Sequence, residues 1–270
     1  MNKSIIENIR KKREFSQLPE KDIEIAFEQF AKRQASEEEK LRLTKELLRK
    51  IFSAFISKKL LSLKEKEPEW ILRKHISTRE RLNYYKEIYQ RIFNEHKKAN
   101  VIDLGAGING FSYPYFKDEE LEINYIAIES VGQLVELMNF YFKKNKLNGR
   151  AVHLSLFELE KVKKIIKDSE TKFQVSSLKN QGRKKKIPKI VFLFKVIDAL
   201  ENLKRDYSKE LISEIVKISD KMVVSFATKS LGNRQKFKAN RNWISEFIYH
   251  NFKVSDDFEV GGERYIIFNK

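Results

Sequence analysis

One short stretch, residues 101–110, constrains the fold of this chain more than any other. It reads Val-Ile-Asp-Leu-Gly-Ala-Gly-Ile-Asn-Gly, an apolar run followed by a glycine-rich turn. A second apolar run, residues 125–128, ends at Glu129, 22 positions after Gly107. Glycines in such a turn let backbone N–H groups approach a ligand closely, and an acid about twenty residues later can bond a ribose hydroxyl. The stretch therefore predicts a strand, a turn and a helix that bind a nucleotide-type ligand, and the alternative is a purely structural turn.

Asp103 distinguishes between two classes of ligand. Dinucleotide-binding domains usually carry an apolar residue at this place, whereas an acid two positions before the first glycine is typical of methyltransferases that use S-adenosyl-L-methionine (SAM). The sequence therefore favours SAM as the cofactor. A nicotinamide cofactor, and hence an oxidoreductase, is the alternative.

The chain divides into two regions with different patterns. Residues 1–95 are helix-patterned and rich in Lys and Arg, with capping-box sequences at residues 36–39 and 77–80. From residue 96 onward, apolar runs that are typical of buried parallel strands alternate with amphipathic segments. These runs lie at residues 101–104, 123–128, 190–194 and 222–226. Residues 258–268, centred on Gly261-Gly262, predict a closing β-hairpin.

This organisation predicts an α/β fold of the class I SAM-dependent methyltransferase type over residues 96–270. Its Rossmann-like sheet would be mostly parallel and would end in an antiparallel hairpin. An all-helical domain over residues 1–95 would precede it.

Composition narrows the function classes. The net charge of +17 favours a nucleic-acid partner, although lysine-rich composition alone is an alternative explanation. The chain has no cysteine, which excludes disulfides, thiolate metal sites and the nucleophile used for methylation at pyrimidine C5. No apolar run is long enough to span a bilayer, and the first residues are too polar for a signal peptide. We expect a cytoplasmic monomer that binds neither a metal nor a membrane.

The segment after the predicted strand at residues 190–194 bears on the methyl acceptor. Enzymes that methylate exocyclic amines carry an Asp/Asn-Pro-Pro-Tyr/Phe segment there, but residues 194–201 contain no proline. Adenine N6 and cytosine N4 are therefore disfavoured. Guanine N7 already has a nucleophilic lone pair, so its methylation needs no general base, and correct positioning alone is worth about 7–11 kcal/mol. We therefore expect no catalytic acid or base.

Two basic segments are candidate RNA contacts. The predicted strand at residues 222–226 leads into a polar loop at the edge where a ligand would enter. It carries the RNA-binding candidates Lys229, Ser230, Arg234, Lys236 and Lys238. Residues 176–189 form a second basic stretch. Each segment is either a phosphate contact or a solvated charged loop.

Three motifs resemble those of the aminoglycoside-resistance 16S rRNA (guanine-N7) methyltransferases, the Arm/Rmt group. His75-Ile76-Ser77-Thr78-Arg79-Glu80-Arg81 resembles the His-x-Ser-Thr-Arg-Glu-Arg of that family. Asp103-Leu104-Gly105-Ala106-Gly107-Ile108-Asn109 resembles its Asp-Leu-Gly-Cys-Gly-Leu-Asn. Val224-Ser225-Phe226-Ala227-Thr228-Lys229-Ser230-Leu231-Gly232 resembles its Val-Ser-Phe-Pro-Thr-Lys-Ser-Leu-Gly, and residues 195–201 resemble its segment after strand four.

The resemblance implies a helical domain that docks on the 30S subunit and a SAM-binding domain that methylates N7 of a guanosine. That guanosine would lie in the decoding-site region of 16S rRNA, near position 1405 in bacterial numbering. Carried over by position, Glu129 would hold the ribose, Leu156 and Phe157 would flank the adenine, and His75, Thr78 and Arg79 would reach the methionine end. Asp103, Gly105, Ala106, Gly107 and Lys195 complete the expected cofactor-binding set.

Several residues depart from the family pattern. Ala106 replaces a cysteine, Gly110 and Ala227 each replace a proline, and Ser155 stands where many methyltransferases place an acid on the adenine amino group. Because of these departures, one alternative is a protein that is not an enzyme. It is a ribosome-assembly factor that binds rRNA and keeps the methyltransferase fold without turnover.

Overall fold

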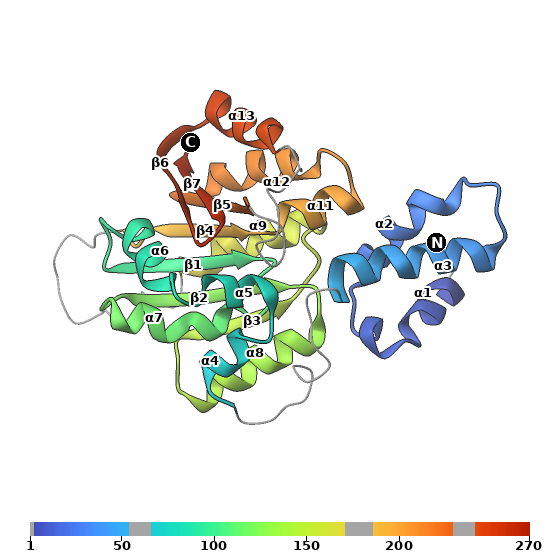
Figure 1. Ribbon diagram of the computed structural model, residues 1–270, viewed down its shortest axis with the longest axis horizontal. Coiled ribbons are helices and arrows are strands. Elements are labelled where there is room, and N and C mark those ends of the chain that lie inside the picture. The colour runs from blue at the N-terminus through green and yellow to red at the C-terminus, as the bar shows by residue number, and fades with distance from the viewer. Residues whose placement is uncertain (1–2, 54–65, 171–185, 229–240) are drawn as a thin grey trace.

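A computed structural model describes residues 3–53, 66–170, 186–228 and 241–270 of the chain. In these ranges, a seven-stranded sheet has the strand order β3-β2-β1-β4-β5-β7-β6 (Figure 1). The strands are β1 (Lys98–Leu104), β2 (Glu122–Glu129), β3 (Gly149–His153), β4 (Lys189–Phe194), β5 (Lys221–Ala227), β6 (Lys253–Val260) and β7 (Glu263–Asn269). Strands β1 to β5 pair in parallel, and β7 is antiparallel to both β5 and β6.

The predicted α/β fold is therefore confirmed. The apolar runs that were interpreted as strands are β1, β2, β4 and β5, and the closing hairpin is formed by β6 and β7. Gly261 and Gly262 make its two-residue turn with φ of 62° and 78°, the left-handed conformation that such turns require.

Helices cover both faces of the sheet, and each face has its own apolar cluster. Val101 and Tyr125 belong to the cluster beneath α4 (Pro68–Leu72), α6 (Tyr85–Ile92), α7 (Tyr113–Asp118) and α8 (Gly132–Lys144). Ile102 and Leu104, which point the other way, belong to the cluster beneath α9 (Leu159–Lys167), α11 (Ile197–Leu203), α12 (Tyr207–Ile215) and α13 (Asn242–Asn251). Strands β1, β2 and β4 are buried along almost their whole length because both faces are covered.

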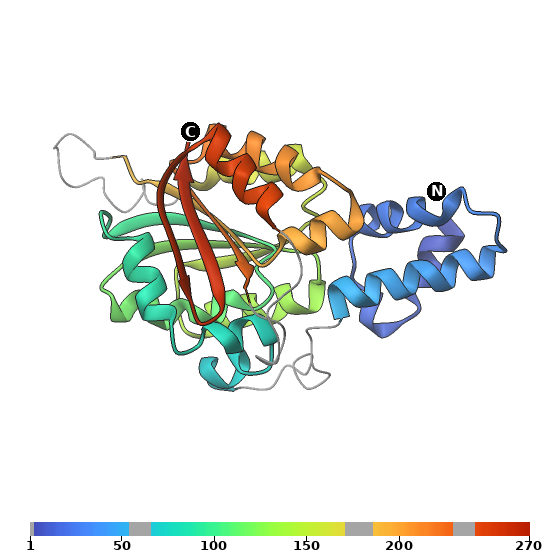
Figure 2. The ribbon, with the colours of Figure 1, turned by 45° about the horizontal axis from the view of Figure 1, so that its top comes forward.

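The first three helices form a lobe at one end of the molecule, beside α11 (Figures 1 and 2). They are α1 (Lys3–Arg10), α2 (Glu20–Ala31) and α3 (Glu37–Leu48), and α3 continues as a π-helical turn at Arg49–Ser53. Ile9, Phe15, Leu18, Ile23 and Leu48 are almost completely buried between them. The first capping-box prediction is confirmed in part: Ser36 is the N-cap of α3, and its hydroxyl accepts a hydrogen bond from Glu39 N at 3.2 Å. The Glu39 carboxylate pairs with Arg42.

The second capping-box prediction, at residues 77–80, is wrong. Helix α5 (Ile76–Arg81) begins before Ser77, and His75 is its N-cap residue. The Thr78 hydroxyl instead donates to the carbonyl oxygen of Leu72 at 2.6 Å and so ties α5 to the end of α4. This contact fixes the segment that carries His75.

Candidate cofactor-binding site

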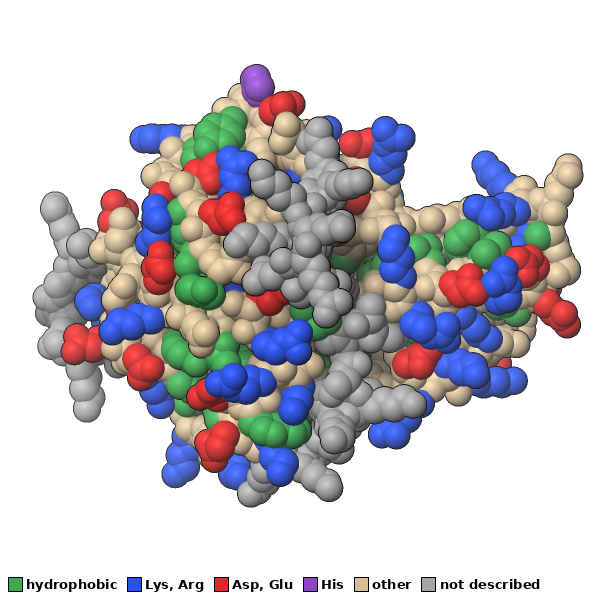
Figure 3. Space-filling model, viewed as in Figure 1, with side chains coloured by type: hydrophobic (Ala, Val, Ile, Leu, Met, Phe, Trp, Pro, Cys, Tyr) green, Lys and Arg blue, Asp and Glu red, His purple; other side chains and the backbone are tan. Residues whose placement is uncertain are grey.

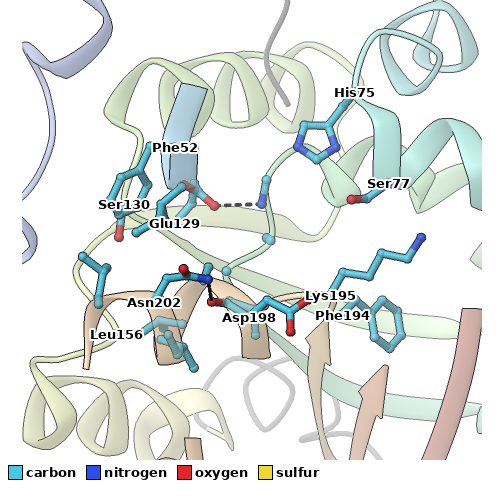
Figure 4. Close-up of a pocket in the computed structure, with 18 of the residues that line it drawn as sticks. Phe52, His75, Ser77, Glu129, Ser130, Leu156, Phe194, Lys195, Asp198 and Asn202 are labelled. Atoms are coloured by element: carbon cyan, nitrogen blue, oxygen red, sulfur yellow. Dashed lines mark hydrogen bonds between the residues drawn. The ribbon is translucent and has the colours of Figure 1, made fainter. Parts of the chain in front are cut away.

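A pocket of about 660 Å³ opens at the carboxyl ends of β1, β2 and β4. Open α/β sheets bind their ligands at this edge, and the volume lies in the range of small-molecule sites. The sheet domain supplies the glycine turn, Glu129, Leu156, Phe157, Phe194 and Lys195, and the helical lobe supplies Asp22 and Phe52. Figure 4 shows Phe52 near Glu129 and Ser130, with Phe194 and Lys195 at the other end.

The glycine turn keeps a hollow open above β1. Gly105 and Gly107 have φ of 70° and 56°, in the left-handed region that favours glycine. A Cβ on Gly105 would lie 2.5 Å from Cγ2 of Val196, and one on Gly107 would lie 3.4 Å from Nε2 of His75. Backbone conformation therefore favours glycine at both positions, and at Gly105 a side chain would also clash with Val196.

Glu129 ties the end of β2 to this turn. Its Oε2 accepts a hydrogen bond from Gly107 N at 2.8 Å (Figure 4). Its Oε1 accepts one from Val131 N, also at 2.8 Å. Burial raises the pKa of Glu129, whereas these backbone N–H groups act to lower it. The acid expected from its spacing thus lies beside the turn and borders the pocket.

His75 lies over Gly107 and borders the pocket together with Thr78. Burial, reinforced by the charges of Arg81 and Lys195, lowers the pKa of His75 to about 4. The imidazole is therefore neutral at pH 7.

Nine of the eleven residues expected at the cofactor line this one pocket, and two do not. Arg79 is exposed. Asp103 is buried beneath the turn, where its carboxylate accepts hydrogen bonds from Asn109 Nδ2 at 2.7 Å and from the Tyr125 hydroxyl. The predicted RNA contacts Lys229, Ser230, Arg234, Lys236 and Lys238 lie outside the described residues, as do residues 176–185 of the second basic stretch.

The structure adds a buried ionic cluster that sequence reasoning did not identify. Arg81 Nε donates to both carboxylate oxygens of Glu263, at 3.1 and 2.9 Å. Lys195 Nζ lies 3.1 Å from Glu263 and 2.6 Å from Glu80. Lys195 borders the pocket and has φ of 56°, a strained conformation for a residue with a side chain. The cluster therefore fixes the end of β4 at the pocket wall.

Asp22 of α2 also borders the pocket, although the sequence did not predict it there. Its side chain is almost fully buried, and Ser155 Oγ donates to its Oδ1 at 2.7 Å. Burial raises the pKa of Asp22 to about 6, although hydrogen bonds from Ser155 and Ser130 oppose the rise. The spacing of residues along the chain gives no hint that α2 contacts the segment after β3.

We expect the Asp22→Asn variant to be more stable than the wild type at pH 7, by up to roughly 3 kcal/mol. The pKa of Asp22 is higher in the folded state than in the unfolded state, so the ionised carboxylate destabilises the fold above pH 6. This penalty disappears as the carboxyl group becomes protonated in both states. Urea unfolding between pH 4 and pH 7 should therefore show the stability difference shrinking as the pH falls, and a difference independent of pH would contradict it.

Comparison with known proteins gives matches in both sequence and structure. A family model described as ribosomal RNA methyltransferase (FmrO) matches residues 44–162. The 16S rRNA (guanine(1405)-N(7))-methyltransferase of Micromonospora echinospora is 28% identical over 163 residues, which are 60% of this chain and 50% of that protein. The enzyme of the same name from Micromonospora rosea is 27% identical over the same lengths. The chain thus spans about half the length of the curated relatives it matches.

Two solved structures match over the whole chain. The 16S rRNA methylase RmtB has a TM-score of 0.72 at 16% identity, with 100% of this chain and 99% of that chain covered. The 16S rRNA methyltransferase RmtF, solved with S-adenosyl-L-homocysteine (SAH), has a TM-score of 0.74 at 18% identity, with both chains covered fully. The predicted family resemblance is confirmed. These matches also establish the class I methyltransferase fold.

Within the described ranges, no three His, Asp or Glu side chains are grouped so that they could hold a metal ion. Of the helices that the structure describes, none combines the length and apolar character needed to cross a bilayer.

Proposed function

We propose that this chain uses SAM to methylate N7 of a guanosine in the decoding-site region of 16S rRNA, near position 1405 in bacterial numbering. The observation that carries the proposal is the pocket at the carboxyl edge of the sheet, bordered by the glycine turn and Glu129. The names of the curated relatives support this choice of base, and the SAH-bound RmtF structure supports the cofactor.

The pocket residues fit this cofactor. The open glycine turn accepts close approach by the ligand, Glu129 is placed for the ribose hydroxyls, and Leu156 and Phe157 offer apolar walls for the base. His75 and Thr78 border the part assigned to the methionine end. Because the His75 imidazole is neutral at pH 7, it adds no positive charge beside a cationic sulfur.

SAM supplies a methyl group on a positively charged sulfur, and guanine N7 supplies the lone pair that attacks it. No proton has to leave before the attack, so no residue needs to act as a base. The protein has to hold N7 in line with the bond that breaks, and alignment of this kind accounts for a large part of a barrier. The rigid support of β4 by the Arg81–Glu263–Lys195 cluster suits such a task.

The rRNA partner is supported by where the positive charge lies in the sequence. Residues 54–65, 171–185 and 229–240 contain 12 Lys or Arg and a single Glu, although they make up 39 of the 270 residues. Figure 3 shows further Lys and Arg side chains on the helical lobe, mixed with Asp and Glu. We propose that the basic segments bind rRNA phosphates, including through Lys229 and Arg234, and that the helical region over residues 1–95 docks on the 30S subunit.

The test is methyl transfer from tritiated SAM to intact 30S subunits and, separately, to naked 16S rRNA. We expect label in the 30S subunit and 7-methylguanosine in the digested rRNA by mass spectrometry. No label in either substrate contradicts the proposal. Binding of 30S subunits without label would instead favour the non-catalytic assembly factor.

A further inference from the structure

The base end of the pocket has apolar walls but lacks the usual acid. Glu129, which is assigned to the ribose, ends β2, and the residues assigned to the base follow β3, the neighbouring strand. There Leu156 and Phe157 provide apolar contact, but Ser155 occupies the place where many methyltransferases carry an acid. An adenine bound here presents a 6-amino group, which needs a hydrogen-bond acceptor when it is buried.

The helical lobe brings a carboxylate to this place. Asp22 of α2 borders the pocket, and the Ser155 hydroxyl donates to its Oδ1 at 2.7 Å. The same hydroxyl accepts from Phe157 N at 3.1 Å, so Ser155 links Asp22 to the backbone of the wall that faces the base. The carboxylate is thus held by the segment that would otherwise supply the acid.

The second carboxylate oxygen of Asp22 is unsatisfied among the described residues. Oδ2 is buried and, among the described residues, forms no hydrogen bond of normal geometry, although the Ser130 hydroxyl is near enough to influence the carboxyl group. An unsatisfied buried carboxylate oxygen is costly, and polar groups left in this state often serve a ligand.

We propose that the helical lobe completes the cofactor site, with Asp22 Oδ2 accepting a hydrogen bond from the adenine 6-amino group in place of an acid at position 155. The inference rests on the proposed function in requiring an adenosyl cofactor. It adds a base-recognising residue that comes from outside the methyltransferase fold.

Other hydrogen bonds fix the position of the helical lobe beside this part of the pocket. Gln29 Nε2 donates to the carbonyl oxygens of Asn202 and Leu203, at 2.7 and 2.8 Å, and Lys50 Nζ lies 3.0 Å from Asn202 Oδ1. Ile51 and Phe52 from the end of the lobe also border the pocket. Since these contacts and Asp22 belong to one small lobe, cofactor binding and lobe position are coupled.

The experiment is calorimetric titration of the full chain with SAH and with S-inosyl-L-homocysteine, in which an acceptor oxygen replaces the 6-amino group. The wild type should bind SAH at least tenfold more tightly than the inosyl compound, because the carboxylate would face an oxygen. Asp22→Asn should weaken SAH binding at least tenfold and reduce the preference between the two ligands. Glu158→Gln is the matched control, because Glu158 acts on Asp22 through space but does not border the pocket, and its SAH affinity should stay within about twofold of the wild type.

The outcomes separate this inference from the proposed function. If the wild type binds SAH and Asp22→Asn binds it equally well, the inference is overturned and the proposed function stands. If the wild type binds no SAH, both fail. If Asp22→Asn does not fold, the titration of the wild type tests the inference by itself. Equal affinity of the wild type for SAH and S-inosyl-L-homocysteine would overturn the role of Asp22.

Discussion

Replacing Arg81 with methionine is expected to lower the free energy of unfolding by about 3–5 kcal/mol. The side chains of Arg81 and Glu263 are only 3% and 2% exposed, so neither charge can be solvated by water. The guanidinium also lies over the Phe194 ring, 5.0 Å from its centroid. The variant leaves the Glu263 carboxylate buried with Lys195 and the Ser225 hydroxyl as its remaining partners of those described.

The pH dependence of this effect follows from the pKa of Glu263. Burial alone would raise that pKa, but the charges of Arg81 and Lys195 and hydrogen bonds from Ser225 and Arg81 hold it below its ordinary value. A carboxyl group with a lowered pKa stabilises the fold above its unfolded pKa and loses that contribution as the pH falls. The difference between wild type and Arg81→Met should therefore be largest near neutral pH and should shrink in acid.

Arg73→Met is the matched control for Arg81→Met. Arg73 pairs with Glu69 at the surface, with side chains 56% and 57% exposed, and such pairs contribute about 0–1 kcal/mol. Denaturant unfolding of both variants measures the contrast directly. Equal losses in the two variants would mean that the buried cluster does not stabilise the pocket wall.

Local patterns predicted most of the sheet. Strands β1, β2, β4 and β5 are continuous apolar runs because helices cover both of their faces, and the Gly261-Gly262 pair marks the hairpin because both residues need positive φ. Strand β3 was not predicted. It is a short edge strand that is only partly buried, so Gly149–His153 lacks an apolar run.

Contacts between residues close in sequence could be predicted at the site, whereas contacts between distant residues could not. The turn at Gly105 and Gly107 and the acid Glu129 follow from spacing within one strand–turn–helix–strand unit. Arg81 and Glu263 are 182 positions apart, and Asp22 and Ser155 are 133 apart. No periodicity reports pairings of this kind, because they depend on how the lobe and the hairpin pack on the sheet.

The Gly107→Val variant is expected to lose at least a hundredfold in SAH affinity while still unfolding cooperatively. Gly107 has φ of 56°, which a β-branched residue adopts only under strain. Its Cβ would already lie 3.4 Å from Nε2 of His75, so the two methyl groups would enter the space beneath the imidazole. Relief of that strain would also disturb the 2.8 Å hydrogen bond from Gly107 N to Glu129, which aligns the acid assigned to the ribose. Isothermal titration with SAH, together with a thermal melt, measures both parts of the expectation.

Gly262→Val is the matched control for Gly107→Val, because it introduces backbone strain at a glycine outside the cofactor pocket. Gly262 has φ of 78° in the β6–β7 turn and does not border the pocket, so valine there carries a similar conformational penalty of about 1–3 kcal/mol without reaching the cofactor. This variant should be less stable than the wild type and should keep its SAH affinity. If Gly107→Val binds SAH as tightly as Gly262→Val does, the turn after β1 does not hold the cofactor. The valine side chain would then have filled the space at Gly107 and displaced Glu129 without any effect on SAH affinity.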